Sequence, residues 1–374
     1  YYFNSKINTE FHLRITANAS TNWAQQDNES ITLVLSIDND WENYNQDIIL
    51  YAGNHSHDYH VSLGPITKGE HTLNFKFDKM KSSPLSESVH IESIEIIKMS
   101  DLNIDPDVIK CSPILYGRDL LAWNESTKTD IPLIMWHEIS QEGNNKRIKY
   151  SIIFSNEDSR IGIGLSDLMY SYGRTTDIEW IYEILLSNDG QIVNEFYQGA
   201  SHVTTPFQGN KIGMHPILKN ATLNCNFSDV GTSDYKFFPS PLLTIPTNNT
   251  REILMDQNPW TYRIMAEELI NEERYESNPD PNTVEISDVR NYIYIEYEGT
   301  VYGDNLNLQI ESNFIDDCNI FFNNHDYSEF NTSYHGGIQR TSIELPHGFN
   351  PLNVHQIGFL SNANNDYSIS INNI

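Results

Sequence analysis

The chain has 374 residues, more than the roughly 250 to 300 that one hydrophobic core usually supports, so we expect two or three domains. Hydrophobic residues make up 39% and charged residues 20%, which excludes a disordered chain, and no apolar run reaches the roughly 18 residues that a membrane-spanning helix needs. The formal net charge of -28 argues against a nucleic-acid partner, because phosphate binding depends on clustered Lys and Arg.

The first part of the chain alternates apolar and polar residues in short runs separated by turn residues, at 11–17, 30–37, 47–51, 59–63, 71–77 and 89–97. Within it, the stretch YHVSLGPITKGEHTLNFKF has a Gly-containing turn between two amphipathic strands. This pattern resembles the accessory jelly-roll modules of carbohydrate-active and adhesive proteins. The spacing of the short strands predicts an N-terminal β-sandwich over residues 1–104.

A polar linker over residues 101–112 leads into a predicted central domain, residues 113–280, that mixes strands with loops. Its strands are expected at 133–139, 148–154, 178–186 and 192–197. After Pro259, apolar residues recur at helical spacing, which predicts one helix that ends before the polar stretch at 277–281.

Alternating runs return in the last part of the chain, at 292–297, 306–310, 320–322, 342–345, 356–360 and 367–371. They predict a second sandwich over residues 283–374. The predicted fold class is mainly β, with two jelly-roll-like sandwiches flanking a central β-rich or α+β domain.

The strand TTDIEWIYEI carries the most unusual group of carboxylates. Period-two alternation places Asp177, Glu179 and Glu183 on one face of the strand. Asp177 and Glu179 could bind Ca²⁺ through their oxygens, or act as acid and base. The alternative is a polar face that meets solvent, with Arg174 pairing one carboxylate. His137, which ends an apolar run, is either a general base or the cap of a core strand.

Two further groups are candidate ligand-binding residues. His202 and His215 lie in the stretch 199–226, where dense Gly and Pro predict loops, although a structural histidine is the alternative for each. Trp23, Trp41 and Tyr44 fall in polar, loop-like settings and could provide the aromatic faces on which sugars stack.

Several features favour an extracellular or cell-surface location. The sequence begins at Tyr1 without an initiator Met, which fits removal of a signal peptide; a disordered start is the alternative. Eight sequons are compatible with N-glycosylation, at Asn18, Asn28, Asn54, Asn124, Asn220, Asn226, Asn248 and Asn331. Of three cysteines, Cys111 and Cys225 flank the central segment and could form one disulfide that leaves Cys318 unpaired; reduced cysteines throughout are the alternative.

Four stretches of the central segment, GRTTDIEWIYE, GASHVTTPFQG, HPILKNATLNCNFSD and NPWTYRIMAEEL, carry a resemblance. Together they resemble a group of uncharacterised predicted secreted proteins over Gly173 to Leu269. The resemblance implies that the segment is one domain, and it implies no activity and no catalytic residues.

Two functions remain open from the sequence. The first is a non-catalytic glycan-binding or structural component, whose partner is a glycan or another protein chain. The second is a secreted polysaccharide-active hydrolase with the central domain catalytic, since a glycosidase needs only two carboxylates. A third possibility is a homo-oligomer or filament built through unpaired strand edges, which would have the same fold as the non-catalytic component. The chain has no GxSxG, HExxH or phosphate-binding loop.

Overall fold

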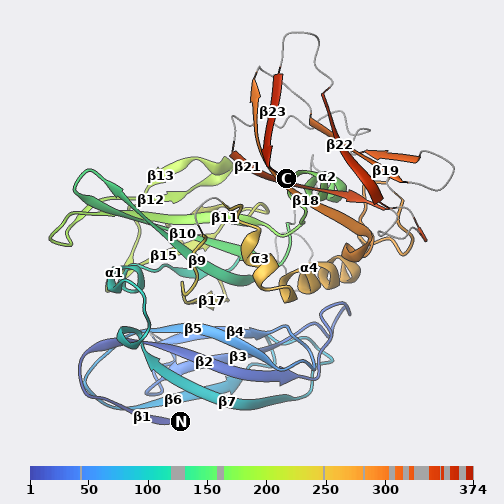
Figure 1. Ribbon diagram of the computed structural model, residues 1–374. Coiled ribbons are helices and arrows are strands. Elements are labelled where there is room, and N and C mark those ends of the chain that lie inside the picture. The colour runs from blue at the N-terminus through green and yellow to red at the C-terminus, as the bar shows by residue number, and fades with distance from the viewer. Residues whose placement is uncertain are drawn as a thin grey trace. The chain divides into compact units, whose positions relative to one another are not determined.

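The computed structural model describes most of the chain. The described residues are 1–42, 44–118, 131–157, 164–246, 249–280, 283–302, 308–314, 320–323, 337–345, 347–348, 354–361 and 368–373. Strands predominate and form several antiparallel sheets, so the predicted mainly β class is confirmed (Figure 1). Among the described residues, no helix is both long and apolar enough to cross a membrane.

The chain folds into two compact units that differ from the three predicted domains. Unit 1 consists of Tyr1–Asp158 and Thr176–Ile245, and unit 2 of Ser159–Thr175 and Pro246–Ile374. The predicted central domain therefore contributes to both units. The reason is that its helical segments pack with the C-terminal strands. These segments lie before and after the strand that carries Glu179, which is called the carboxylate strand below.

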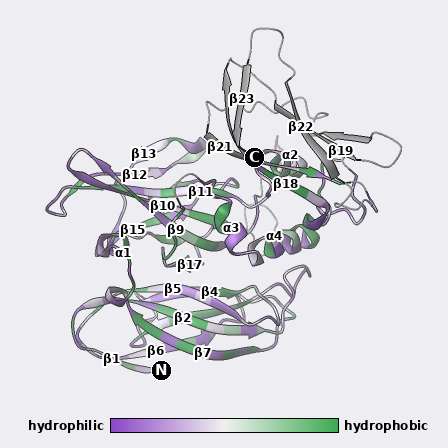
Figure 2. Cartoon of the chain, in the orientation of Figure 1, coloured by the Kyte–Doolittle hydropathy of each residue, from purple (hydrophilic) through white to green (hydrophobic). Residues whose placement is uncertain are grey.

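The N-terminal part of unit 1 contains two antiparallel sheets (Figure 1). One has the order β1 (Tyr2–Ser5), β6 (Gly69–Phe77), β3 (Ile31–Ile37), β4 (Asn45–Leu50), and the other β5 (His57–Ile66), β2 (Thr9–Ala19), β7 (Val89–Lys98). Figure 2 shows hydrophobic and hydrophilic residues mixed along β2 and β7. In β2, Leu13, Ile15 and Ala17 are fully buried at alternate positions, as a strand with one core face requires.

The rest of unit 1 is built from a second group of sheets. A five-stranded antiparallel sheet has the order β13 (Thr204–Pro206), β12 (Ile192–Gln198), β11 (Ile178–Leu186), β10 (Asn145–Phe154), β9 (Pro132–Glu142). A smaller sheet joins β14 (Lys211–Ile212), β15 (His215–Asn220), β8 (Ile114–Tyr116) and β17 (Lys236–Phe237), with β16 (Phe227–Ser228) paired to β15. Short helices accompany them: η1 (Met99–Asp101), α1 (Pro106–Lys110) and η3 (Ala200–His202).

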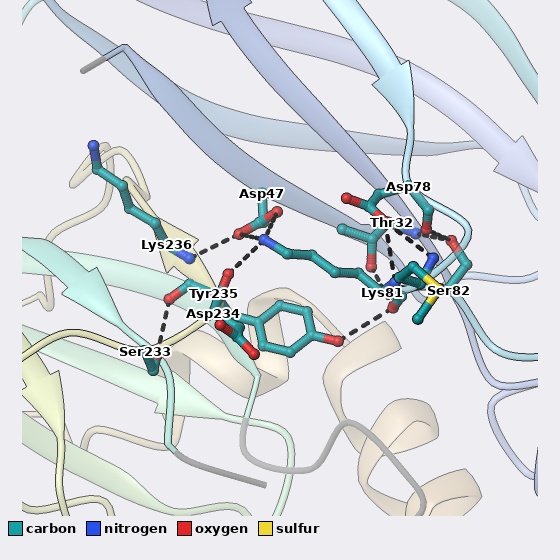
Figure 3. Close-up of polar contacts among 10 residues, drawn as sticks. Thr32, Asp47, Asp78, Lys81, Ser82, Ser233, Asp234, Tyr235 and Lys236 are labelled. Atoms are coloured by element: carbon teal, nitrogen blue, oxygen red, sulfur yellow. Dashed lines mark hydrogen bonds and ion pairs between the residues drawn. The ribbon is translucent and has the colours of Figure 1, made fainter. Parts of the chain in front are cut away.

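A buried ion pair attaches β17 to the N-terminal sheets within unit 1 (Figure 3). Lys81 Nζ donates to both oxygens of Asp47, at 2.8 and 2.9 Å, and also to the carbonyl of Asp234. The backbone N–H of Lys236 donates to Asp47 at 2.8 Å, and Lys81 Nζ lies 5.2 Å from the centre of the Tyr235 ring. Asp47 therefore has its charge compensated although it is only 3% exposed.

Unit 2 combines helices with two sheets. Its helices are α2 (Leu165–Tyr172), α3 (Ile253–Gln257), α4 (Trp260–Asn271) and η4 (Val289–Asn291). Its sheets have the orders β21 (Gly337–Glu344), β18 (Tyr292–Tyr302), β23 (Ser368–Asn373) and β20 (Ile320–Asn323), β19 (Leu308–Phe314), β22 (Val354–Ser361). The predicted helix after Pro259 is present as α4.

The inserted segment that carries α2 is held to the C-terminal part of unit 2 by buried polar contacts. Thr341 and Ser342 of β21 donate hydroxyl hydrogen bonds to the carbonyls of Tyr170 and Met169 at the end of α2. Arg174 Nε donates to Glu252 at 2.8 Å, and both side chains are almost fully buried. These contacts explain why residues 159–175 leave the carboxylate strand that follows them and join unit 2.

Candidate functional site

A β-bulge changes the faces that alternation predicted for the carboxylate strand. Between β10 and β11, Tyr150 pairs with Tyr182 and Ser151 with Trp180, so Ile181 is the extra residue. Beyond the bulge Glu183 lies opposite Lys149, whose Nζ is 5.4 Å from the centre of the Trp180 ring. The predicted sharing of one face by Glu179 and Glu183 is therefore wrong, because the extra residue reverses the alternation.

Glu179 and His202, two of the predicted site residues, meet in unit 1. His202 Nδ1 is 3.2 Å from Glu179 Oε1, and Gln198 Nε2 donates to Glu179 Oε2 at 2.5 Å. The same amide nitrogen is 2.6 Å from His202 Nδ1, and Asn226 Nδ2 is 3.4 Å from it. With Glu179 buried and the His202 side chain 54% exposed, the group places a solvent-facing imidazole beside a buried carboxylate.

The backbone that carries His202 is strained. Ser201 and His202 have φ of 58° and 59°, in the left-handed region that non-glycine residues seldom adopt. Two consecutive residues in that region cost on the order of 1–3 kcal/mol each, so the surrounding structure must hold them there. Strain of this kind is common where a side chain is positioned for a task.

The other predicted catalytic residues, Asp177 and His137, are both buried. Asp177 precedes β11 and is 5% exposed, and its carbonyl accepts a hydrogen bond from Phe154 N–H. His137 is buried on β9, where its Nδ1–H donates to the Pro241 carbonyl at 2.9 Å. Strand β10 lies between it and Glu179, and His137 pairs with Tyr150 whereas Glu179 pairs with Ile152, so their backbones are more than about 10 Å apart. Burial lowers the pKa of His137, as expected of a structural histidine.

Three aromatic residues predicted to bind ligand have different surroundings. Trp23 is 2% exposed and packs edge-on against Tyr51, so its predicted role as a stacking platform is wrong: the ring belongs to the core. Trp41 and Tyr44 are 38% and 41% exposed. His215 is buried and lines a separate cavity that is described below.

The sequons and cysteines differ in accessibility. Asn54 is exposed, whereas Asn220 and Asn226 are buried and their Nδ2 atoms donate to Cys225 Sγ and to the Asn224 carbonyl. A glycan on either nitrogen would displace these contacts, so we expect both sequons to be unoccupied in the folded chain. Sequons at Asn124, Asn248 and Asn331 lie outside the described residues.

Cys111 and Cys225 are both buried and are not bonded to each other, so the predicted disulfide between them is not formed. Burial, with nearby carboxylates, raises the pKa of Cys111 to about 12, which makes its thiol unreactive. Cys318 lies outside the described residues. The described part of the chain contains no cluster of three or more His, Cys, Asp or Glu side chains that could hold a metal ion, and the predicted Ca²⁺ site at Asp177 and Glu179 stays a prediction.

Sequence reasoning missed a groove of about 860 Å³ in unit 2. One stripe of α4 forms a wall of it, with Tyr262, Ala266 and Ile270 at helical spacing. Tyr292 and Tyr294 of β18 form a second wall, and Tyr275 also lines the groove. The opposite stripe of α4, which includes Ile264, Met265 and Leu269, is buried.

Planar polar groups lie among these tyrosines. Arg340 donates to both oxygens of Asp256, at 2.7 and 2.9 Å, and to Tyr262 Oη at 3.0 Å. Its guanidinium carbon lies 5.5 Å from the centre of the Tyr294 ring. Burial raises the pKa of Tyr262 and Tyr294, so their hydroxyls stay protonated. Tyr262 Oη donates to Asp256 Oδ1 at 2.9 Å, and Tyr294 Oη donates to the Val289 carbonyl at 2.8 Å.

Two signals in the sequence could have revealed the groove. Tyr292 and Tyr294 are two residues apart in a strand and so share a face, and α4 has a second apolar stripe opposite its core stripe. Comparison with known proteins adds no assignment: no protein-family model matches the chain, and no curated protein is significantly similar to it.

Proposed function

We propose that the protein is a non-catalytic, secreted or cell-surface glycan-binding protein whose groove in unit 2 holds a neutral saccharide. The observation that carries the proposal is the combination of four tyrosines with the Arg340–Asp256 pair around one groove. Aromatic rings offer flat apolar surfaces to the C–H faces of a sugar, and planar charged groups in fixed positions can pair with its hydroxyls.

The volume of the groove and the net charge of the chain limit the class of ligand that can bind. The groove volume of about 860 Å³ lies in the range of roughly 300–1,000 Å³ that is usual for small-ligand sites. The net charge of -28 disfavours an acidic polysaccharide, since the field of the whole chain repels it. A neutral oligosaccharide therefore fits best.

The proposal also assigns a role to the two N-terminal sheets. We infer that β1–β6–β3–β4 and β5–β2–β7 pack as a jelly-roll-like β-sandwich that acts as an accessory module. The many buried residues of both sheets support this packing, including Leu35 and Leu50 in the first and Leu13 and Leu63 in the second.

Substitutions in the groove test glycan binding. The Tyr275→Ala variant should bind a neutral oligosaccharide about tenfold more weakly, because the ring is only partly buried and its loss removes a stacking surface. Ala266→Trp should block the groove. An array of neutral and acidic glycans would select the ligand, and isothermal titration calorimetry would give the affinities.

Tyr2→Ala is the matched control, since Tyr2 is 85% exposed and lies in unit 1. It should bind as the unmodified chain does. The proposal fails if no neutral glycan is retained on the array, or if the Tyr275→Ala and Tyr2→Ala proteins bind equally well.

The Glu179–His202 pair favours a second candidate, a polysaccharide-active hydrolase. An imidazole that lies beside a carboxylate and is open to solvent can act as a general base. If it does, Glu179→Gln and His202→Asn should each reduce product release at least 100-fold on a polysaccharide panel, while the control Glu70→Gln, at an exposed position on β6, should not. Failure of the unmodified protein to release product from any polysaccharide would reject this candidate.

A further inference from the structure

A second cavity, of about 540 Å³, lies in unit 1 and is independent of the groove in unit 2. Most of its lining is apolar, with Pro65, Ile66, Met99, Pro106, Ile109 and Met214 among its walls. Its volume is within the usual range for a small ligand, and the flexible thioethers of the methionines can adapt to an occupant.

Two polar groups, Glu10 and His215, face each other in this apolar lining. Glu10 Oε2 is 3.6 Å from His215 Nε2, which is too long for a hydrogen bond. The Oε2 atom is buried and has no hydrogen-bond partner among the residues that the structure describes. A buried carboxylate oxygen without a hydrogen bond lowers the stability of the folded protein unless a donor reaches it.

The orientation of the His215 ring determines what can fill this gap. Its Nδ1 is 2.9 Å from the Ser112 carbonyl, which can only accept, so Nδ1 carries a proton. The edge-on contact with the Phe238 ring, at 4.8 Å between centres, holds the imidazole in this orientation. In the neutral form of His215, Nε2 is therefore an acceptor that points toward a second acceptor on Glu10.

We propose that this cavity binds an amphiphile with an apolar chain and a primary ammonium group. The ammonium, with three donors, would insert between Glu10 and His215 and satisfy both acceptors, while the chain would lie against the apolar walls. Lys110 also lines the cavity, but it is solvent-exposed and its charge is screened, whereas the Oε2 atom of Glu10 is buried. The carboxylate therefore decides the sign of the ligand charge.

Three probes of equal chain length test the head group, used below the concentrations at which they form micelles. Dodecylamine should bind the full chain at least tenfold more tightly than dodecanoate, with dodecanol between them, because charge-assisted hydrogen bonds are the stronger ones. Displacement of a fluorescent hydrophobic probe, checked by calorimetry, would measure the three affinities.

Two variants place the ligand in the cavity. Glu10→Gln keeps the size of the side chain and should weaken dodecylamine about tenfold, with little change for dodecanol. Met214→Trp should weaken all three probes by filling the space. The controls Glu70→Gln and Met80→Trp, at exposed positions, should bind as the unmodified chain does, and melting curves would confirm that each variant is folded.

Three results would overturn the proposal. These are binding of none of the probes, binding of dodecanoate as tightly as dodecylamine, and a folded Glu10→Gln protein with unchanged affinity for the amine. The last result would show that water or another protein group satisfies the Glu10 carboxylate.

Discussion

Two stacked histidines at the residue scale show how burial sets a protonation state. His12 Nδ1 is 2.8 Å from Ser240 Oγ, and His12 Nε2 is 3.0 Å from His60 Nδ1. Burial lowers the pKa of His12 from its ordinary 6.5 to about 3, and the neighbouring charges of His60 and Arg14 act in the same direction. Burial also lowers the pKa of His60, although Asp58 opposes this. Both imidazoles are therefore neutral in the folded protein at pH 7.

This pair predicts loss of stability on mild acidification. The unfolded chain takes up a proton on His12 near pH 6.5, while the folded chain resists it down to about pH 3, so the contribution is complete above pH 6.5 and declines below it. Between pH 7 and pH 5, His12 alone should reduce the free energy of unfolding by about 2 kcal/mol. Urea unfolding at several pH values would measure the slope.

The His12→Gln variant should show a shallower decline with falling pH, whatever its stability at pH 7. His90→Gln, at an exposed position, should keep the slope of the unmodified protein. An unchanged slope in His12→Gln would show that other groups control the acid response.

At the scale of elements, a buried ion pair is one of the contacts that attach β17 and the residues after it to the N-terminal sheets, beside the hydrogen bonds of Ser62 N–H to the Phe238 carbonyl and of His12 to Ser240. Burial raises the pKa of Asp47, and the Lys81 ammonium opposes that rise. The backbone N–H of Lys236 joins β17 to Asp47 of β4 directly, and Lys81 pairs with the same carboxylate.

Removal of the Lys81 ammonium should therefore reduce the free energy of unfolding. We expect Lys81→Met to reduce the free energy of unfolding by about 3 kcal/mol, since Asp47 would remain buried without its cation. The double variant Asp47→Asn with Lys81→Met should recover part of that loss, because Asn is neutral. Chemical denaturation would compare both with Lys76→Met, an exposed control on β6; equal stability of the Lys81→Met and Lys76→Met proteins would contradict this account.

At the scale of the whole molecule, the chain passes between its two units more than once. Residues 159–175 leave unit 1 to place α2 in unit 2, and the chain then returns to form the carboxylate strand β11. Unit 2 is therefore assembled from two separate segments. A boundary drawn at any single position cannot describe this arrangement.

Local patterns in the sequence were sufficient to predict most of the strands and the helix α4. The alternating runs predicted six strands of the N-terminal part, and the structure has a strand at each of them, from β2 to β7. The helix after Pro259 was predicted for a similar reason, since Ile264, Met265 and Leu269 bury one stripe. Such patterns are local because each side chain's direction depends on the backbone within a few residues.

The candidate sites were harder to predict. His202 was a candidate for its loop setting and Glu179 for its strand, and only the pairing of β11 with β12 brings Gln198 beside both. The bulge at Ile181 has no signature in the alternation, and it moved Glu183 to the other face. The burial of Trp23 was also missed, because a polar loop can still fold over an aromatic ring.

The sequence by itself determined the mainly β class, the place of most strands and the position of α4, because side-chain periodicity is a local property of the backbone. The tertiary structure alone decided which strands are neighbours, where α2 is inserted, and which distant residues line the groove and the cavity. These depend on contacts between residues far apart in the chain, and one pattern of alternation is compatible with many such pairings.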